Sequence, residues 1–156
     1  MTIVFTSPIA GGAQTGFTSP TYTVTADTSA PNPRTKQVAV TSLGGTQSGV
    51  RTSTVSDPFT VGYTPPANLK VLPQPNPVTG KYPPIPFNVH QFNFRKGMNF
   101  ATNQIPLVGY AELRIGIPAG AESADPANIR ALASLIEGSV AAFVAGLGDT
   151  LVTGIP

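Results

Sequence analysis

Alternating apolar and polar residues cover the first part of the chain and predict β-strands. Residues 21–25 alternate Thr with Tyr or Val, and residues 37–43 resume the alternation after a Pro-Asn-Pro turn. A period of two is typical of half-buried strands, and two such runs around a turn predict a hairpin over residues 21–43. The first 20 residues are rich in Gly, Ser and Thr, so we expect an N-terminal extension that is mostly loop, with a short strand at residues 3–5.

Residues 50–118 continue the strand pattern and are predicted to form an antiparallel sheet. One face is apolar and the other small and polar, as in a sheet covered on one side. Phe87 and Val89 have the opposite parity to Phe92 and Phe94, which predicts a β-bulge or a strand start near Val89. Residues 65–86 hold 8 of the 17 prolines and are expected to form a connection outside the sheet, because proline cannot donate a ladder hydrogen bond. The predicted strands are residues 50–54, 58–64, 87–96 and 106–118.

After Gly120 the apolar spacing changes to the helical period. Asp125 followed by Pro126 is a strong helix start, and an apolar stripe then continues to residue 144. We therefore expect a helical region and apolar tail over residues 125–156, as one bent helix or as two helices. Strands followed by a helix predict an α+β fold. A single amphipathic helix leaves a broad sheet under-covered, which favours a dimer whose second chain adds another helix.

Charge is scarce and unevenly placed in this sequence. Only 10% of the 156 residues are charged, against about 25% in an ordinary domain, which suits a protein that buries much of its surface against copies of itself. Residues 28–118 contain eight Lys or Arg and two Asp or Glu, whereas residues 119–156 contain one basic and four acidic residues. This asymmetry indicates a polyanion on the basic side, with an accidental bias of a solvated surface as the alternative.

The residues needed for catalysis or metal binding are scarce. The chain has no cysteine and one histidine, His90, which alternates with Phe92 and Phe94 and is interpreted as structural. It also lacks the sequence motifs of zinc proteases, nucleophile elbows and phosphate-binding loops. We expect no catalytic residues, no metal site and no cofactor, and therefore no enzyme. No apolar run approaches a membrane span and no signal sequence begins the chain, so we expect a cytoplasmic protein without a membrane partner.

The polar face of the predicted sheet is the best candidate site. Arg neutralises phosphates, Tyr stacks on unpaired bases, and Thr, Asn and Gln hydrogen-bond base edges or 2′-hydroxyls. Glu112 is expected to pair with Arg114 or Arg95. An ordinary solvated face remains the alternative. The predicted RNA-binding residues are Thr60, Thr64, Gln91, Asn93, Arg95, Tyr110, Glu112 and Arg114.

A long strand over residues 110–118 ends at a proline, runs into a capped helix and finishes at Thr153-Gly154-Ile155-Pro156. This C-terminal third resembles the coat proteins of single-stranded RNA bacteriophages. The order and spacing of short stretches resemble a divergent branch of that levivirus-like family. These stretches are residues 22–27, 43–47, 76–80, 95–97, 124–130 and 146–150.

The resemblance implies a fold and a function. It implies an intertwined homodimer that closes into an icosahedral shell, assembled in the bacterial host cytoplasm and present in the virion, with the inner sheet face on single-stranded genomic RNA. Tyr110 and Glu112 match RNA-facing positions of the family's last strand, and Thr60, Thr64, Asn93 and Arg95 match preceding strands. Residues 97–104 match the loop that surrounds the symmetry axes. The connection at residues 65–86 is longer than in the best-known members, and residues 1–20 are extra.

A secreted β-rich adhesin or pilus-like domain is the alternative function. Such a domain is also rich in Thr and associates with itself. The lack of a signal sequence and the acidic helical C-terminus beside a basic sheet argue against it. The sequence therefore predicts one coat protein domain over residues 1–156.

Overall fold

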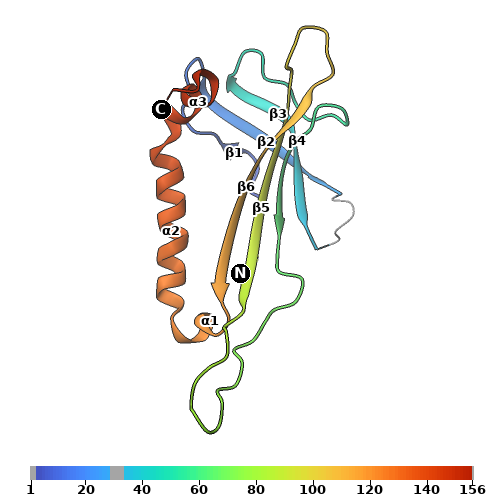
Figure 1. Cartoon of the computed structure of the whole chain (residues 1–156). Coiled ribbons are helices and arrows are strands. Elements are labelled where there is room, and N and C mark those ends of the chain that lie inside the picture. The colour runs from blue at the N-terminus through green and yellow to red at the C-terminus, as the bar shows by residue number, and fades with distance from the viewer. Residues whose placement is uncertain (1–2, 29–33, 156) are drawn as a thin grey trace.

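A six-stranded antiparallel sheet forms the centre of the computed structural model, which describes residues 3–28 and 34–155. Each strand pairs with the next one along the chain, so the sheet is a simple meander (Figure 1). The antiparallel sheet and the C-terminal helical region predicted from the sequence are confirmed. The strands are β1 (Ile9–Ala10), β2 (Thr18–Asp27), β3 (Lys36–Thr46), β4 (Phe59–Thr64), β5 (Phe87–Met98) and β6 (Leu107–Pro118), and the helices are α1 (Ala121–Ala124), α2 (Pro126–Ala142) and α3 (Val144–Thr153).

The hairpin β2–β3 holds the best-buried apolar residues. Val24 of β2 lies opposite Val40 of β3, and Val38 completes a small buried cluster. Tyr22 packs edge-on against Phe59 at its margin, with ring centroids 5.4 Å apart. Among the described residues, Pro20 and Ala119 are the other residues with buried apolar side chains. The single chain therefore has a small core at one end of the sheet.

The pairing of β5 with β6 sets the two faces of the sheet. Twelve residue pairs run without a register shift from Phe87 opposite Pro118 to Met98 opposite Leu107. Of the two alternatives for this position, the bulge near Val89 is therefore wrong, and the strand starts at Phe87. Because the alternation is unbroken, Phe87 and Val89 lie on the same face as the polar residues of β5, and not with Phe92 and Phe94.

Two predicted strands are absent. Residues 3–5 are not a strand, and the first pairing of the chain comes at β1 instead. Residues 50–54 form part of an ordered connection, in which the Ser53 amide donates to the carbonyl of Val40 over 2.8 Å. The Ser53 hydroxyl oxygen also accepts from the Phe59 amide over 3.0 Å. Side-chain and isolated backbone bonds thus hold this segment where alternation alone predicted a ladder.

The helical region consists of separate helices. The side chain of Asp125 accepts from the Asn128 amide, and Pro126 occupies the first turn, so α2 starts where the sequence predicted. The sequence left open one bent helix or two, and the structure has two, because α2 ends at Ala142 and the segment 146–153 of α3 is bent from it by 65°. Figure 1 shows α2 as a rod beside the sheet, and no residue of α2 is buried.

The chain exposes far more surface than a compact monomer. Its accessible surface is 10987 Å². A folded monomer of 16.1 kDa is expected to expose about 7,400 Å². The excess of about 3,600 Å² includes apolar side chains of the sheet, such as Phe94 and Leu107, and of α2, such as Val140. Much of the apolar surface in this fold is therefore uncovered by the chain itself.

Candidate nucleic-acid interface

The eight residues predicted to bind RNA lie on one face of the sheet. Residues of β4 oppose residues of β5, as in Thr60 with Arg95 and Thr64 with Gln91. Residues of β5 in turn oppose residues of β6, as in Asn93 with Glu112. Since side chains that face each other across paired strands share a side, this surface is continuous. We call it the polar face, made of Thr60, Thr64, Gln91, Asn93, Arg95, Tyr110, Glu112 and Arg114.

The polar face is hollowed at its centre. Seven of its eight residues, all but Arg114, line a shallow depression of about 520 Å³. Tyr110 is 79% exposed, so one ring face is open to a planar partner. Thr60 is only 6% exposed and forms part of the floor. Among the predicted residues, Thr60 is therefore the least able to contact a ligand.

Charged and polar groups on this face are partly paired with each other. Arg114 Nη2 donates to Glu112 Oε2 over 2.9 Å, which confirms the predicted pairing of Glu112 with an arginine. Gln91 Nε2 donates to Asn93 Oδ1 over 2.9 Å. Arg95 is exposed and makes no ion pair with any residue that the structure describes. Arg95 is thus the cation of this face best placed to meet a phosphate.

Several residues of this surface were missed by sequence reasoning. Thr35 and Gln37 line the same depression from β3 and the turn before it. The Thr35 and Thr64 hydroxyls are 2.8 Å apart and hydrogen-bonded. Phe87 and Val89 also belong to this side, because the expected bulge is absent. The β3–β4 register would have revealed Gln37, since Gln37 opposes Gly62, but register is not readable from one strand alone.

His90 lies on the opposite, apolar face and contacts Tyr63. The Tyr63 hydroxyl and His90 Nδ1 are 2.8 Å apart, and the two rings are stacked with centroids separated by 6.1 Å. Burial raises the pKa of Tyr63 above its ordinary value. Among the described residues, no group of three or more His, Cys, Asp or Glu side chains could hold a metal ion. His90 has a structural partner, in line with its interpretation from the sequence.

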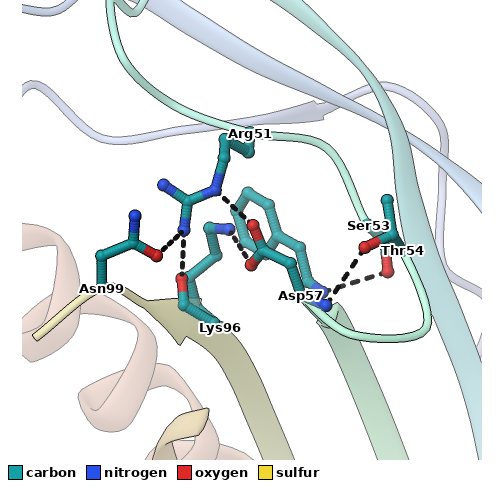
Figure 2. Close-up of polar contacts among 8 residues, drawn as sticks. Arg51, Ser53, Thr54, Asp57, Lys96 and Asn99 are labelled. Carbon is teal, nitrogen blue, oxygen red and sulfur yellow. Dashed lines mark hydrogen bonds and ion pairs between the residues drawn. The ribbon is translucent and has the colours of Figure 1, made fainter. Parts of the chain in front are cut away.

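A cluster of ion pairs fastens the connection before β4 to the end of β5. Figure 2 shows Asp57 between Arg51 and Lys96: Arg51 Nε donates to one carboxylate oxygen, and Lys96 Nζ donates to the other over 3.0 Å. Arg51 Nη2 also donates to the Gly97 carbonyl and to Asn99 Oδ1, each over 3.3 Å. We call Arg51, Asp57, Lys96 and Asn99 the Asp57 clasp. It reaches the base of the loop over residues 99–106, which overlaps the predicted loop at residues 97–104.

Glycine is required beneath this clasp. A Cβ atom at Gly97 would collide with the carboxylate of Asp57. The hydrogen bond from Arg51, assisted by Lys96, holds the pKa of Asp57 below its ordinary value even though burial acts to raise it. Asp57 is therefore charged at neutral pH and contributes stability in that form.

The fold and its surfaces define a class of protein. A six-stranded antiparallel meander with an open polar face, an uncovered apolar face and a C-terminal helix beside the sheet is suited to a subunit of a larger assembly. Such a chain has exposed surfaces that can contact other chains. In the described residues, no group of three or more His, Cys, Asp or Glu side chains could hold a metal ion.

Comparison with known proteins narrows this class. No family model and no curated protein matches the chain. A solved structure described as a virus-like particle of bacteriophage ESE020 matches with a TM-score of 0.94 and 45% sequence identity, and the match covers 99% of this chain and 100% of that chain. The chain therefore belongs to the family of bacteriophage coat proteins, as the resemblance in its sequence indicated.

The helices were also compared with the length of a membrane span. Within the part of the chain that the structure describes, no single helix is long and apolar enough to cross a bilayer, although the bent pair of α2 and α3 meets that length and composition together.

Replacing the carboxylate of the clasp tests its contribution. We expect Asp57→Asn to lower the free energy of unfolding by about 3 kcal/mol at neutral pH, because two cations then lose their buried partner. The pKa of Asp57 is lower in the folded chain than its ordinary value of 3.8, so its stabilisation is present above that value and is lost as the pH falls through the lower, folded-state value. Urea unfolding of the full-length protein at matched concentration and several pH values measures both effects.

The exposed carboxylate Asp27 provides the control for this experiment. Asp27→Asn should change the free energy of unfolding by no more than about 0.5 kcal/mol. If the gap between wild type and Asp57→Asn stayed constant into strong acid, the charge of Asp57 would not be its cause.

Proposed function

We propose that this chain is a structural coat protein that dimerises and self-assembles into an icosahedral shell enclosing single-stranded RNA. The observation that carries the proposal is the full-length match to a protein whose structure is described as a virus-like particle. In this proposal residues 1–156 act as one coat domain. The protein acts in the virion after assembly in the bacterial host cytoplasm, and its role is structural, without a cofactor.

The uncovered surface supports a dimer. β6 is a twelve-residue edge strand with no partner on its outer side among the described strands. Exposed edges of this length readily pair with another chain. Phe94, on the apolar face next to β6, is 43% exposed, and α2 does not bury it. Pairing of two β6 edges, with each α2 laid across the partner's apolar face, would remove both exposures in one step.

The amount of uncovered surface supports contacts beyond the dimer. An obligate dimer of ordinary size buries about 1,000–2,500 Å² on each chain. The excess surface of this chain, about 3,600 Å², is larger than that. A closed shell, in which each dimer meets several others, accounts for the remainder.

The polar face supports contact with RNA on the interior. Arg95 and Tyr110 oppose each other across β5 and β6, so a cation and an exposed aromatic ring stand side by side. That pair suits a phosphate and its unpaired base. Four of the seven carboxylates of the chain lie in residues 119–156, which include the helical region. This favours a position of the helices on the outer surface, away from the polyanion.

Expression of the chain alone tests the proposal directly. We expect spherical particles in the void volume of a sizing column, visible by electron microscopy and containing RNA that survives nuclease treatment. The physical reason is that the uncovered apolar surface finds partners in copies of the chain while the cationic face retains RNA. A stable monomer or dimer free of nucleic acid, over a range of salt concentrations, would contradict the proposal.

A charge placed on the apolar stripe of α2 tests the dimer. Val140 lies in that stripe near the C-terminal end of α2 and is 58% exposed in the single chain. We expect Val140→Glu to raise the dimer Kd by about 100-fold or more, because an unpaired carboxylate would be buried in the interface. Analytical ultracentrifugation measures the Kd.

Ser134→Glu is the matched control, since Ser134 is exposed and lies about 120° around α2 from Val140. It should leave the Kd within about two-fold of the wild-type value. Equal behaviour of the two variants would mean that the apolar stripe is not the dimer contact.

Removal of two cations tests the polar face. We expect Arg95→Ala with Arg114→Ala to reduce the packaged RNA per chain by about two-fold or more, because each lost phosphate contact weakens retention of RNA, while dimerisation is unchanged. The ratio of phosphorus to protein in purified particles measures the RNA content. The control is Lys81→Ala with Arg130→Ala, two exposed cations outside the polar face. Unchanged RNA content in the Arg95 and Arg114 variant would exclude this face as the binding surface.

A further inference from the structure

We propose that a second hollow at the lower end of the polar face holds an unpaired base of the enclosed RNA, stacked on Phe87. The proposal rests on the proposed function, since its ligand is single-stranded RNA. The hollow has a volume of about 620 Å³ and lies between the last residues of β4, the first residues of β5 and the beginning of the Pro-rich connection. We call it the Phe87 hollow.

The position of Phe87 is the first argument. The uninterrupted β5–β6 register puts Phe87 and Val89 on the polar face. The residues of β5 that follow on that side, from Gln91 to Arg95, are all polar. Phe87 is 53% exposed, and its ring leans over β6, where a Cβ at Gly116 would stand 3.5 Å from Cδ1. An aromatic ring open to solvent within a polar surface is the feature on which unpaired bases stack.

The charge around the ring is the second argument. Arg34 and Lys70 line the Phe87 hollow from two different segments, and no carboxylate is among the described residues that line it. The Lys70 backbone is fixed, because its amide donates to Asn88 Oδ1 over 2.8 Å and its carbonyl accepts from Asn88 Nδ2 over 3.0 Å. The Lys70 side chain itself is exposed. Two cations beside an exposed ring complement a phosphate joined to a base.

Continuity with the polar face is the third argument. Thr64 and Gln91 line both the central depression and the Phe87 hollow. A strand of RNA that crosses Tyr110 and Arg95 can therefore continue to Phe87 without leaving the sheet. The wall formed by Pro65 and Pro66 comes from the Pro-rich connection, which gives this long segment a direct role in shaping the site.

A binding experiment with two probes tests the inference. The full-length protein, kept at a concentration where light scattering detects no shells, is titrated into a labelled single-stranded RNA of about 20 nucleotides. Inorganic polyphosphate, which has the charge but no bases, is titrated in parallel as a competitor of the labelled RNA, and this competition gives its own affinity for the protein. We expect Phe87→Ala to weaken RNA binding by about five-fold or more, the equivalent of one lost base stack, and to leave polyphosphate binding within about two-fold.

Further variants separate stacking from other effects. Phe87→Leu keeps an apolar side chain but has no aromatic face, and should weaken RNA binding like Phe87→Ala, whereas Phe87→Tyr should retain it. Lys70→Ala should weaken binding of both probes, because it removes charge. Tyr82→Ala is the matched control, since Tyr82 is also 53% exposed but does not line the hollow, and it should bind RNA as wild type does.

The outcomes distinguish this inference from the proposed function. Unchanged RNA binding by Phe87→Ala, together with weakened binding by the Arg95 and Arg114 variant, would overturn the inference and leave the polar face as the RNA surface. If Phe87→Ala lost dimers or shells but bound RNA unchanged, the inference would be overturned too, because the hollow would then bind a side chain of a neighbouring copy. Equal weakening for RNA and polyphosphate would also overturn it, since stacking would then not be the cause. If Phe87→Ala weakened RNA binding and the Arg95 and Arg114 variant did not, the result would support the Phe87 hollow as an RNA site and exclude the central depression as one.

Discussion

The twelve-pair ladder between β5 and β6 determines most of what this protein presents to its surroundings. Because its register never shifts, every side chain of the two longest strands is assigned to one of two faces by parity alone. Tyr110, Arg95 and Glu112 are gathered on one side, and Phe92, Phe94 and Leu113 on the other. A shift of one residue would exchange these two sets. The Asp57 clasp lies at one end of this ladder and fixes the connection before β4 against it, so the same ladder also positions the loop over residues 99–106.

The two faces have different degrees of completion within one chain. The polar face already has its depressions, its cations and its exposed rings. The apolar face is covered only near Val24, Val38 and Val40, and α2 leaves the rest open. In the proposed assembly, folding of the single chain forms the polar face, whereas the apolar face is covered only when chains associate. Membership of the bacteriophage coat protein family agrees with that division.

Periodicity and turn chemistry predicted much of the fold, because they are local. Alternation located β2 to β6, and the Asp125–Pro126 pair located the start of α2. Errors came where tertiary contacts decide the outcome. Residues 50–54 alternate like a strand but bond through Ser53 to two separate segments, and the parity change before Phe92 indicated a bulge that the β6 partner does not allow. Parity placed the eight predicted residues on one face, whereas Gln37 and the Phe87 hollow depend on how distant segments are aligned, which no single strand specifies.

The solitary position of α2 has a consequence for the life of the molecule before assembly. A chain whose apolar surface is covered only by its neighbours has no fixed free energy of folding of its own, because in the proposed assembly mass action adds to its stability as the concentration rises. Newly made chains at low abundance would then be the form most open to proteases and to misassociation through β6. The amount of coat protein in the cell would thereby control how much of it survives, and its accumulation would be self-reinforcing.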